Sequence, residues 1–441
     1  MVGNGGRLFG TDGVRGRANT ELTVEVALDL ARAAGEGVEA PVVIGRDTRR
    51  SSPMLASALH AGFNAVGVDT VDVGIIPVGA VSRLARDTGS HYGVMVSASH
   101  NPAEDNGIKF LGRDGAKLSD DREDEIAARY HRGAPWRRPW GGAIGIQSVM
   151  SDALERYLDY LVEGFDYRLR GMAFVMDCAN GAAVHAAPAL FGRLGAEVEV
   201  HNADPDGMNI NRGCGATHPE YLAAHTAGRV GLAFDGDADR LIAVDEDGVP
   251  ANGDVLMAMF AHHLKDLGKL KNDTVVATVM SNLGFRRAMD RLGVTVVETP
   301  VGDRYVLEAM RRTHAVLGGE QSGHVVLSDR STGDGLRTAL QLAAILASTG
   351  RELRELRTVM REYPQVLQNV KVADTGALGA AAPVWDAVGE AERRLGGEGR
   401  VLVRASGTEP LVRVMVEASD PELAESVASA VSTVVERELG G

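Results

Sequence analysis

Short runs of valine, isoleucine and leucine, each ending in a polar loop, alternate along most of this chain with longer amphipathic segments. Residues 24–34 carry apolar side chains at helical spacing, with Thr23 as a candidate N-cap and Gly35 as a candidate stop signal. Such alternation is typical of parallel strands joined by crossover helices. The sequence therefore predicts an α/β fold.

The apolar runs and their loops occur in three pairs. The pairs are 42–44 before GRDTR with 92–96 before SASHNP, 174–176 before DCANG with 230–234 before DGDADR, and 275–280 before SNLG with 315–317 before GGEQSGH. The repetition is one of architecture rather than of sequence, and it predicts three similar mixed α/β domains. Because ligands of such sheets bind at loops beyond the carboxyl ends of the strands, these polar loops are candidate sites.

The pattern changes after Pro364. The sequence there predicts a helix, two strands and a second helix, at residues 383–395, 400–404, 411–417 and 421–438. We expect these elements to form a smaller C-terminal α+β domain. The four expected domains span residues 1–150, 151–250, 251–365 and 366–441.

Charge and composition argue against several classes of protein. The 46 Lys and Arg residues against 60 Asp and Glu give a net charge of -14, which disfavours a general binder of nucleic acid or anionic membranes. No apolar run approaches the ~18 residues of a membrane span, and no signal peptide is recognisable. Cys178 and Cys214 cannot form a disulfide framework. We therefore expect a cytoplasmic protein, in which a phosphate-bearing ligand requires locally clustered cations.

The motif DGDADR at 235–240 places Asp235, Asp237 and Asp239 directly after an apolar run. Three carboxylates at this spacing can converge on one hard cation such as Mg²⁺, which prefers oxygen ligands in near-octahedral geometry. A solvated acidic turn is the alternative interpretation, whereas an EF-hand is disfavoured because the glycine is misplaced. The sequence thus points to a divalent metal site and leaves the acidic turn open.

The motif SASHNP at 97–102 places serines and His100 at the end of another apolar run. A serine there is a candidate nucleophile, with His100 or Lys109 moving the proton. A polar turn closed by Asn-Pro is the alternative. A Ser/His/Asp hydrolase is a further competitor, although the G-x-S-x-G motif of α/β-hydrolases is absent from the sequence.

Four further motifs carry groups suited to anions or sugars. Arg404, Ser406, Gly407, Thr408 and Arg413 form a candidate anion cradle, because guanidinium groups and loop amides bind phosphate oxygens. The glycine-flanked stretch 318–324 suits sugar hydroxyls. Arg15 in stretch 10–16 and Arg304 in the tripeptide Gly302-Asp303-Arg304 can balance anionic charge. Taken singly, the three arginine-containing motifs also fit ordinary turns with exposed arginines, and 318–324 is weak evidence as an isolated string.

The motifs are specific as a set. FGTDGVRG at 9–16, SASHNP at 97–102, DGDADR at 235–240, GEQSGH at 319–324 and RASGTEPLVR at 404–413 closely resemble, in this order, the α-D-phosphohexomutase superfamily. The Gln321 form of the fourth motif is similar to that of members acting on glucosamine phosphates. The resemblance implies three related α/β domains and a smaller C-terminal domain around a central cleft.

The resemblance also implies a reaction. Ser99 would carry a phosphoryl group, and one Mg²⁺ per active site would lie between that phosphate, Asp235, Asp237 and Asp239. The implied activity interconverts glucosamine 6-phosphate and glucosamine 1-phosphate through glucosamine 1,6-bisphosphate, on the route to UDP-N-acetylglucosamine. Glucosamine or glucose 1,6-bisphosphate would serve as activator.

The remaining site residues receive their roles from the same resemblance. Lys109, Arg15 and Arg240 would balance charge near Ser99, and either Lys109 or His100 would handle the proton. Glu320 and Ser322 would hold the sugar hydroxyls, and the second phosphate would be bound by Arg404, Ser406, Gly407, Thr408 and Arg413. Gly302, Asp303 and Arg304 are further candidate substrate-binding residues.

Three competing functions remain at this point. The first is a phosphomannomutase/phosphoglucomutase with related motifs, and the second is a metal-dependent phosphatase that uses the same serine. The third is a non-catalytic sugar-phosphate sensor, which would be expected to lose the nucleophile or a metal ligand. A phosphosugar is the expected partner, nucleic acid and membrane are not, and the sequence leaves a homo-oligomer open.

Overall fold

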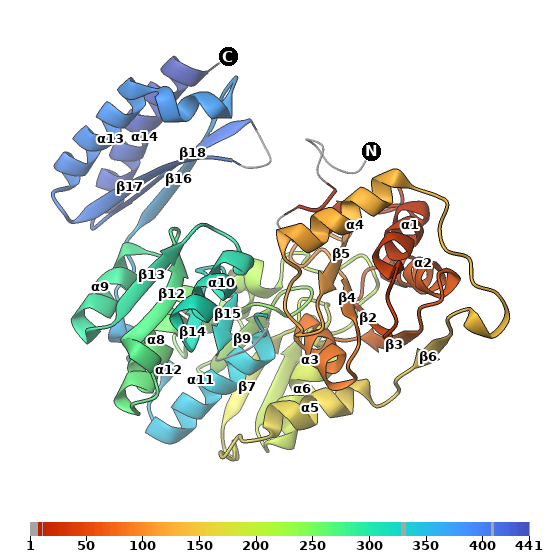
Figure 1. Ribbon diagram of the computed structural model, residues 1–441. Helices are drawn as coiled ribbons and strands as arrows, with labels where there is room; N and C mark the ends of the chain where they lie inside the picture. The colour runs from red at the N-terminus through yellow and green to blue at the C-terminus, as the bar shows by residue number, and fades with distance from the viewer. Residues whose placement is uncertain (1–7, 11, 328–331, 407–409, 441) are drawn as a thin grey trace. The chain divides into compact units, whose positions relative to one another are not determined.

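The computed structural model describes residues 8–10, 12–327, 332–406 and 410–440. These residues form two compact units, the first made of Met1–Met280 with Val294–Thr358 and the second of Ser281–Gly293 with Val359–Gly441. Each unit combines sheets with covering helices (Figure 1), which confirms the predicted fold class. The four domain ranges expected from the sequence stay a prediction.

The first unit holds most of the strands and helices. Its strands are β1 (Val14–Arg17), β2 (Val42–Arg46), β3 (Thr70–Ile75), β4 (Tyr92–Val96), β5 (Asp105–Leu111), β6 (Gln147–Val149), β7 (Ala173–Asp177), β8 (Glu197–His201), β9 (Val230–Phe234), β10 (Leu241–Val244), β11 (Pro250–Ala251), β12 (Thr274–Thr278), β13 (Thr295–Thr299), β14 (Leu317–Gly319) and β15 (Val325–Leu327). Its helices are α1 (Val24–Gly35), α2 (Ser52–Ala65), α3 (Val78–Asp87), α4 (Asp120–Arg132), α5 (Ala153–Val162), α6 (Ala183–Arg193), α7 (Pro219–Ala223), α8 (Gly253–Asp266), α10 (Asp303–Thr313), α11 (Gly335–Thr349) and α12 (Leu353–Leu356).

Three mixed sheets organise this unit. Their strand orders are β1-β5-β4-β2-β3-β6, β11-β10-β9-β7-β8 and β13-β12-β14-β15. Parallel pairs such as β2 with β4, β7 with β9 and β12 with β14 lie at the centres. The predicted crossover connections are present between these strands.

One sequence expectation about the sheets is corrected. The three sheets also contain antiparallel pairs, among them β4 with β5, β9 with β10, and β14 with β15. The connections within these pairs are too short for a crossover helix, so the chain turns back as a hairpin. The loops of SASHNP, DGDADR and GEQSGH lie in these three hairpins, at corresponding positions of the three sheets.

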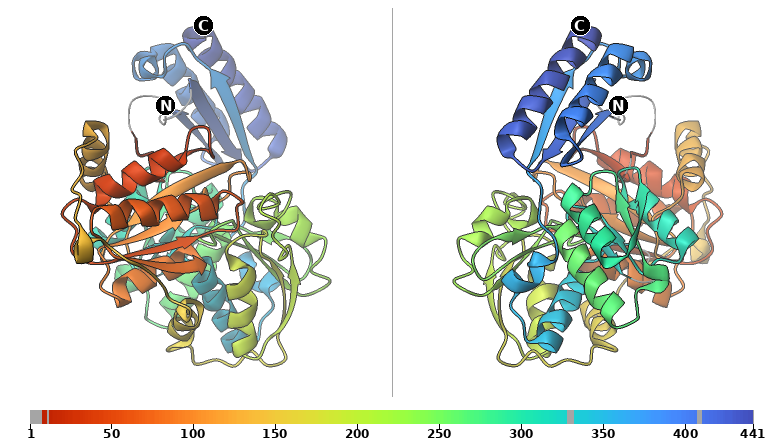
Figure 2. Two further views of the ribbon diagram at one scale, coloured as in Figure 1. Left: turned by 90° about the vertical axis from the view of Figure 1, so that its right-hand side faces the viewer. Right: turned by 90° about the vertical axis from the view of Figure 1, so that its left-hand side faces the viewer.

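The first helix shows how local sequence determines these elements. The Thr23 side chain accepts a hydrogen bond from the Val26 amide and caps α1 as predicted. Ala27, Leu30 and Ala31 lie on the buried face, and burial of a leucine side chain alone contributes roughly 1.5–3 kcal/mol. Helices α1 and α2 pack side by side over the first sheet (Figure 2).

The second unit is built on a three-stranded antiparallel sheet in the order β16-β18-β17. Its elements are β16 (Gln365–Lys371), β17 (Gly399–Ala405), β18 (Leu411–Ala418), α9 (Leu283–Leu292), α13 (Ala382–Leu395) and α14 (Pro421–Leu439). Helices α13 and α14 cover one face of the sheet (Figure 1). The two strands and two helices predicted after Pro364 are confirmed.

Two features of the second unit were not predicted. Strand β16 lies at the sheet edge with most of its side chains half buried or exposed, so its sequence shows no continuous apolar run. The start of helix α9 is bonded to the C-terminal sheet, where the Leu283 amide donates to Glu417 Oε2 at 3.0 Å. Among the described residues, no helix has both the length and the apolarity needed to cross a membrane.

Candidate active site

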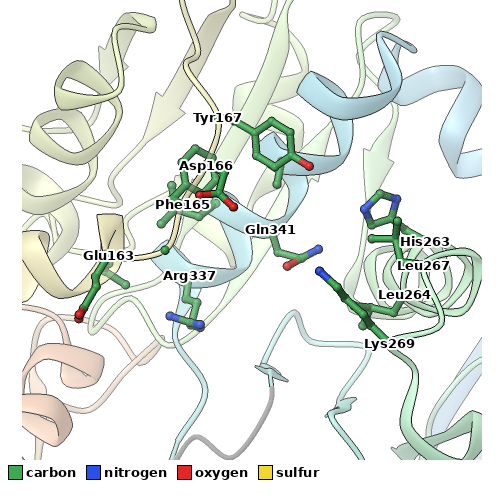
Figure 3. A pocket seen from close by; sticks show the side chains of 14 residues that line it. Glu163, Phe165, Asp166, Tyr167, His263, Leu264, Leu267, Lys269, Arg337 and Gln341 are labelled. Atoms are coloured by element: carbon green, nitrogen blue, oxygen red, sulfur yellow. The ribbon is translucent and has the colours of Figure 1, made fainter.

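A hollow of about 280 Å³ lies in the first unit between the segment 161–167, α8 and α11 (Figure 3). Tyr167, His263 and Lys269 are among the side chains that line it. None of the residues predicted to form a site contributes to this hollow. The candidate site is instead the place where the three motif hairpins meet.

Ser99 lies at the centre of that place. Its side chain is buried, and its Oγ is 2.6 Å from Asp235 Oδ2 and 3.3 Å from His100 Nδ1. Its φ of 52° is left-handed, a conformation that costs a non-glycine residue on the order of 1–3 kcal/mol. The loops of SASHNP and DGDADR are therefore brought together as expected, and the surrounding contacts must hold Ser99 in this conformation.

A buried guanidinium provides those contacts. Arg49 is fully buried beside Asp47, at 2.8 Å. It donates hydrogen bonds to the carbonyl oxygens of Ser99 at 2.9 Å, Asn101 at 2.8 Å and Asp105 at 3.1 Å. Neither residue was predicted from the sequence. Both belong to the polar GRDTR segment, which begins in the last residues of β2, the strand next to β4.

Asp47 completes the support of the serine loop. Its Oδ2 accepts a hydrogen bond from Ser97 Oγ at 2.7 Å, and Ser97 Oγ in turn accepts one from the Ser99 amide at 2.9 Å. Asn211 adds a second bond to the Ser99 carbonyl oxygen at 2.9 Å. The candidate nucleophile is thus held by a continuous buried network.

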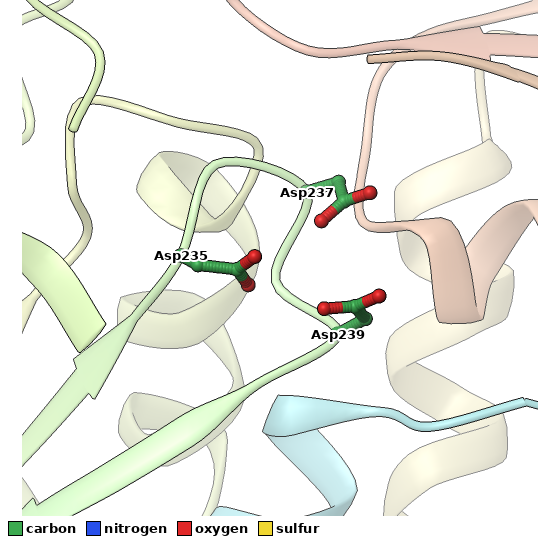
Figure 4. Close-up of side chains that lie close together, drawn as sticks. All are labelled: Asp235, Asp237 and Asp239. Atoms are coloured by element: carbon green, nitrogen blue, oxygen red, sulfur yellow. The ribbon is translucent and has the colours of Figure 1, made fainter. Parts of the chain in front are cut away.

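The three aspartates of DGDADR converge as the sequence predicts (Figure 4). One carboxylate oxygen of each lies within 4.8 Å of the others, and all three side chains are buried. Burial, together with the charges of Asp239 and Asp237, raises the pKa of Asp235 well above its usual range. Among the described residues, Asp237 Oδ1 and Asp239 Oδ1 have no hydrogen-bond partner. Buried carboxylate oxygens without partners fit a hard divalent cation.

A glycine lets the two loops approach. A Cβ at Gly236 would lie 2.3 Å from the Ser99 carbonyl oxygen. Any side chain at this position would therefore push the aspartate turn away from the serine loop.

Lys109, on β5, reaches the aspartates from the first sheet. Its Nζ lies 2.8 Å from Asp237 Oδ2, 3.0 Å from Asp12 Oδ2 and 3.6 Å from Asp239 Oδ2. Burial opposes its charge, but Asp12 and Asp237 outweigh burial and raise the pKa of Lys109 well above its usual range. The ammonium group therefore stays charged.

His100 has the opposite electrostatic setting. Burial, followed by the nearby charges of Arg240 and Arg15, lowers the pKa of His100 to about 4. Its imidazole is therefore neutral at pH 7. The two groups that the sequence proposed as proton handlers thus differ in charge.

Arg15 and Asp12 belong to the same cluster. Arg15 pairs with Asp12, and its Nη1 donates to Asn101 Oδ1 at 3.2 Å. Lys117 Nζ bridges Asp12 Oδ1 and Asp303 Oδ1, each at 3.0 Å. Asp12 and Lys117 were not predicted, although Asp12 stands in the FGTDGVRG motif beside the predicted Arg15.

Arg240 faces the aspartates from the far end of their turn. Its amide donates to Asp235 Oδ1 at 3.2 Å, and its Nε lies 3.9 Å from Asp239 Oδ1. Burial opposes the charge, but Asp235 and Asp239 raise the pKa of Arg240. This placement suits the charge-balancing role expected for it.

The GEQSGH loop contacts the loop before α10. The Gly302 amide donates to Glu320 Oε1 at 3.0 Å, and Ser322 Oγ is 3.5 Å from Glu320 Oε2. The buried His324 Nδ1 is 3.4 Å from Asp239 Oδ2, and although burial opposes the charge, Asp239 raises the pKa of His324 to about 9. The sequence analysis gave His324 no role of its own, although it ends the GEQSGH motif.

Arg304 is placed differently from Glu320 and Ser322. Its guanidinium pairs with Asp120 and with the buried Glu123, at 2.7 Å from the latter. Both carboxylates belong to α4. The structure therefore shows Arg304 joined to the first sheet's helix layer, and its contact with a sugar stays a prediction.

The predicted anion cradle lies in the second unit. Arg404 and Arg413 face each other directly across the β17–β18 pair, an arrangement in which like charges destabilise a sheet. Burial, together with the charge of Arg413, lowers the pKa of Arg404. The buried Ser406 donates its amide to the Leu411 carbonyl oxygen at 2.8 Å. Gly407 and Thr408 lie outside the described residues.

Comparison with known proteins gives these features a family. Models of phosphoglucomutase/phosphomannomutase α/β/α domains I, II and III match residues 6–135, 155–248 and 252–363, and the model of the C-terminal domain matches 367–434. A phosphoglucosamine mutase of Streptomyces griseus is 50% identical over 452 residues, which cover 99% of this chain and 100% of the relative.

Solved structures agree with the sequence comparison. A phosphoglucomutase/phosphomannomutase family protein of Burkholderia thailandensis has a TM-score of 0.82 at 26% identity, with 98% of this chain and 97% of the other covered. An N-acetylphosphoglucosamine mutase of Aspergillus fumigatus, solved with GlcNAc-6P and magnesium, shares the fold at a TM-score of 0.71 and 19% identity, over 98% and 96% of the two chains.

The resemblance inferred from the five motifs is thereby confirmed. Domain models of one family account in order for nearly the whole chain, and the buried serine and aspartate loops lie within the ranges that those models match. The chain belongs to the phosphoglucomutase/phosphomannomutase family.

Proposed function

We propose that this chain interconverts glucosamine 6-phosphate and glucosamine 1-phosphate through a phosphoserine at Ser99 and a glucosamine 1,6-bisphosphate intermediate. The observation that carries the proposal is the 2.6 Å contact of Ser99 Oγ with Asp235, inside the buried aspartate cluster. The choice of sugar is supported by relatives of about 50% identity that bear the name phosphoglucosamine mutase. The product would enter the synthesis of UDP-N-acetylglucosamine.

The proposed transfer is balanced over one cycle. The bond between phosphorus and Ser99 Oγ breaks while a bond from phosphorus to the free sugar hydroxyl forms, and that hydroxyl gives its proton to a base. The bisphosphate then returns its other phosphoryl group to Ser99 Oγ, and the sugar oxygen that is released takes up a proton. Such transfers depend mainly on positioning and charge stabilisation, which the network around Ser99 provides.

The aspartate cluster fits one Mg²⁺. Asp235, Asp237 and Asp239 would hold it together with an oxygen on Ser99, because two of these carboxylates keep a buried oxygen without a partner among the described residues. When bound, the cation supplies positive charge that offsets the charge of the phosphoryl group. Arg15 adds further positive charge from the first sheet.

The two candidate proton handlers are His100 and Lys109. The neutral His100 imidazole, 3.3 Å from Ser99 Oγ, is suited to accept a proton. The raised pKa of Lys109 means that its ammonium group holds its proton tightly, so Lys109 is suited to balance negative charge.

The remaining predicted residues would bind the ends of the sugar phosphate. Glu320 and Ser322, with Gly302, Asp303 and Arg304, would contact the sugar hydroxyls. Arg404, Ser406 and Arg413, with Gly407 and Thr408, would bind the phosphate that is not reacting. Glucosamine or glucose 1,6-bisphosphate would restore the phosphoserine when it is lost, and we place the reaction in the cytoplasm.

The phosphoserine is tested by mass and by turnover. The full-length protein should carry an adduct of ~80 Da, the mass of one phosphoryl group, and Ser99→Ala should lose both the adduct and mutase turnover while still binding substrate. Ser57→Ala, an exposed serine on α2, is the matched control and should keep both. Normal turnover in Ser99→Ala would refute the mechanism.

The sugar is tested by a substrate panel. We expect kcat/KM to be highest for glucosamine 6-phosphate, compared with glucose 1-phosphate and mannose 1-phosphate. A strong preference for a neutral sugar would replace our assignment with a phosphomannomutase/phosphoglucomutase. Steady release of inorganic phosphate would instead identify a phosphatase, and binding without any turnover a sensor.

A further inference from the structure

Two helix starts hold the backbone of the aspartate turn. The Val78 amide, at the first residue of α3, donates to the Asp237 carbonyl oxygen at 3.0 Å, and the Gly335 amide, at the first residue of α11, donates to that of Ala238 at 2.9 Å. Ala238 has a left-handed φ of 58°, which needs outside support. The position of the aspartates therefore depends on where α3 and α11 begin.

A buried tyrosine and aspartate join these helix starts. Asp334, directly before α11, accepts hydrogen bonds from the Leu336 and Arg337 amides at 3.1 Å each and so caps the helix. The hydroxyl of Tyr157, on α5, donates to both of its carboxylate oxygens, at 2.9 and 2.8 Å. Tyr157 is fully buried, so the ring leaves the hydroxyl little room to move.

The same carboxylate also touches α3. A Cβ at Gly79, in the first turn of that helix, would lie 2.5 Å from Asp334 Oδ2. Asp334 therefore contacts α3 and α5 while it caps α11. Neither Tyr157 nor Asp334 belongs to the five motifs, and neither contacts the aspartate cluster itself.

We propose that Tyr157 and Asp334 are positioning residues that set the geometry of the metal-binding turn through the first turns of α3 and α11. The inference rests on the proposed metal site. It adds to the three ligands the contact between Tyr157 and Asp334, here called the joint, which supports their backbone. Removal of the Tyr157–Asp334 contact should loosen the aspartate turn and weaken binding of the cation, while the proposed sugar contacts of Glu320 and Ser322 stay intact.

The test compares variants that remove the joint with variants that keep it. Tyr157→Phe removes one hydroxyl and keeps the ring, and Asp334→Ala removes the carboxylate. Asp334→Asn should act as the conservative rescue, because asparagine caps helices as well as aspartate does and its amide can bond the Tyr157 oxygen. Tyr221→Phe is the control, since its hydroxyl contacts His201 Nδ1 at 3.2 Å away from the turn.

Two measurements on the full-length protein are decisive. Calorimetric titration should show Mg²⁺ binding weakened about tenfold in Tyr157→Phe and Asp334→Ala, the range known for supporting partners of metal ligands. The variant that combines Tyr157→Phe with Asp334→Ala should lose no more Mg²⁺ affinity than the single variant with the larger loss, because both changes break the same contact. KM for the sugar phosphate should not change. Hydrogen exchange of the metal-free protein should speed up in the peptide that spans the aspartate turn.

The outcomes separate the two proposals. If the wild-type chain binds no Mg²⁺, the proposed metal site fails. If it binds Mg²⁺ and Tyr157→Phe binds it equally well, with unchanged exchange in the turn, the positioning role is overturned and the metal site stands. Asp334→Asn that behaves like Asp334→Ala would also overturn it, and Tyr157→Phe covers the case in which Asp334→Ala does not fold.

Discussion

The carboxylates of Asp235, Asp237 and Asp239 in the first unit and the guanidinium groups of Arg404 and Arg413 in the second are both clusters of like charge. The aspartates are at most 7% exposed, whereas both arginines are half buried. Repulsion is therefore far less screened by water in the first cluster. Lys109, Arg240 and His324 offset part of the charge of the aspartates, and a resident cation would offset the rest. A half-buried cluster tolerates a counter-ion that comes and goes.

This difference matches the roles proposed for the two clusters. A metal that stays through the cycle suits the aspartates, and a substrate phosphate that exchanges in every cycle suits the arginines. The aspartates also have a rigid support that includes Arg49 and Asp47, both fully buried. The following variants test whether the two clusters differ in this way.

The largest effect is expected when an aspartate is removed. Asp237→Ala deletes a carboxylate with a buried, unpartnered oxygen, so Mg²⁺ binding should weaken by at least the ~100-fold that loss of a supporting partner can cost. Turnover should fall by about 10³-fold, as for other losses of charge stabilisation. Calorimetry and a coupled assay measure the two values. Asp266→Ala, an exposed aspartate near His262, should match wild type, and unchanged Mg²⁺ affinity in Asp237→Ala would place the metal elsewhere.

Loss of the buried guanidinium should act next most strongly. Arg49→Met leaves the buried Asp47 carboxylate without its ion pair, which should lower the free energy of unfolding by about 3–5 kcal/mol. Displacement of Ser99 should lower kcat by about 100-fold. Denaturant titration and steady-state kinetics measure these effects, with the exposed neighbour Arg50→Met as control.

A double variant at Asp47 and Arg49 separates the effect on protein stability from the effect on the position of the Ser99 loop. Asp47→Leu combined with Arg49→Met should regain much of the lost stability, because no buried charge is left unpaired. It should not regain kcat, since the hydrogen bonds to the Ser99 loop are still missing. Recovery of kcat would show that Arg49 serves stability alone.

A smaller effect is expected from the arginine cluster. Arg413→Ala removes charge-assisted hydrogen bonds worth about 1.5–3 kcal/mol, which predicts a KM raised roughly 10- to 100-fold. The free energy of unfolding should change little or rise, because the variant relieves the repulsion with Arg404. Arg437→Ala, an exposed arginine in the same unit, is the control. A KM equal to that of wild type would mean that the phosphate binds elsewhere.

The smallest effect concerns pH in the metal-free protein. The pKa of Asp235 is raised in the folded state, while in the unfolded chain it is about 3.9. Between these two values the folded protein binds more protons, so this group's contribution to stability falls as pH rises above about 4. Asp235→Asn should remove that fall and raise the melting temperature at pH 7 by roughly 1–2 °C for each kcal/mol relieved, because the entropy of unfolding grows with chain length.

Melting curves with a chelator, recorded at several pH values, test this prediction. Addition of Mg²⁺ should stabilise wild type more than Asp235→Asn, because the cation binds the charged carboxylate. If the melting temperatures of the two proteins changed equally with pH in the presence of the chelator, the buried charge of Asp235 would not destabilise the fold as expected.

Local sequence predicted the elements better than their connections. The cap at Thr23 and the helix 421–438 follow from propensity and periodicity, and both are present. The antiparallel return of β5, β10 and β15 was not predicted, because a short polar stretch between two apolar runs does not show whether the second strand runs parallel or antiparallel to the first. Strand β16 was missed because an edge strand buries few of its side chains.

The candidate site shows the same limit. Asp235, Asp237 and Asp239 stand close together in sequence, so their convergence could be predicted. Arg49 contacts the Ser99 loop from a distant part of the chain, and only the approach of two neighbouring strands brings them together. Lys117 meets Asp303 in the same way. Long-range ion pairs of this kind have no local pattern.

The hairpin position of the three motif loops has a consequence for chain entropy. A loop that joins two adjacent, hydrogen-bonded strands has both ends fixed a short distance apart, so little freedom remains to be lost when it is ordered. The groups on SASHNP, DGDADR and GEQSGH are therefore largely ordered before a ligand arrives, and binding energy is not spent on ordering them. Each loop can also change in sequence while its two strands keep their pairing. One sheet design can in this way present the proposed nucleophile, the proposed metal ligands and the proposed sugar contact without any change in the surrounding fold.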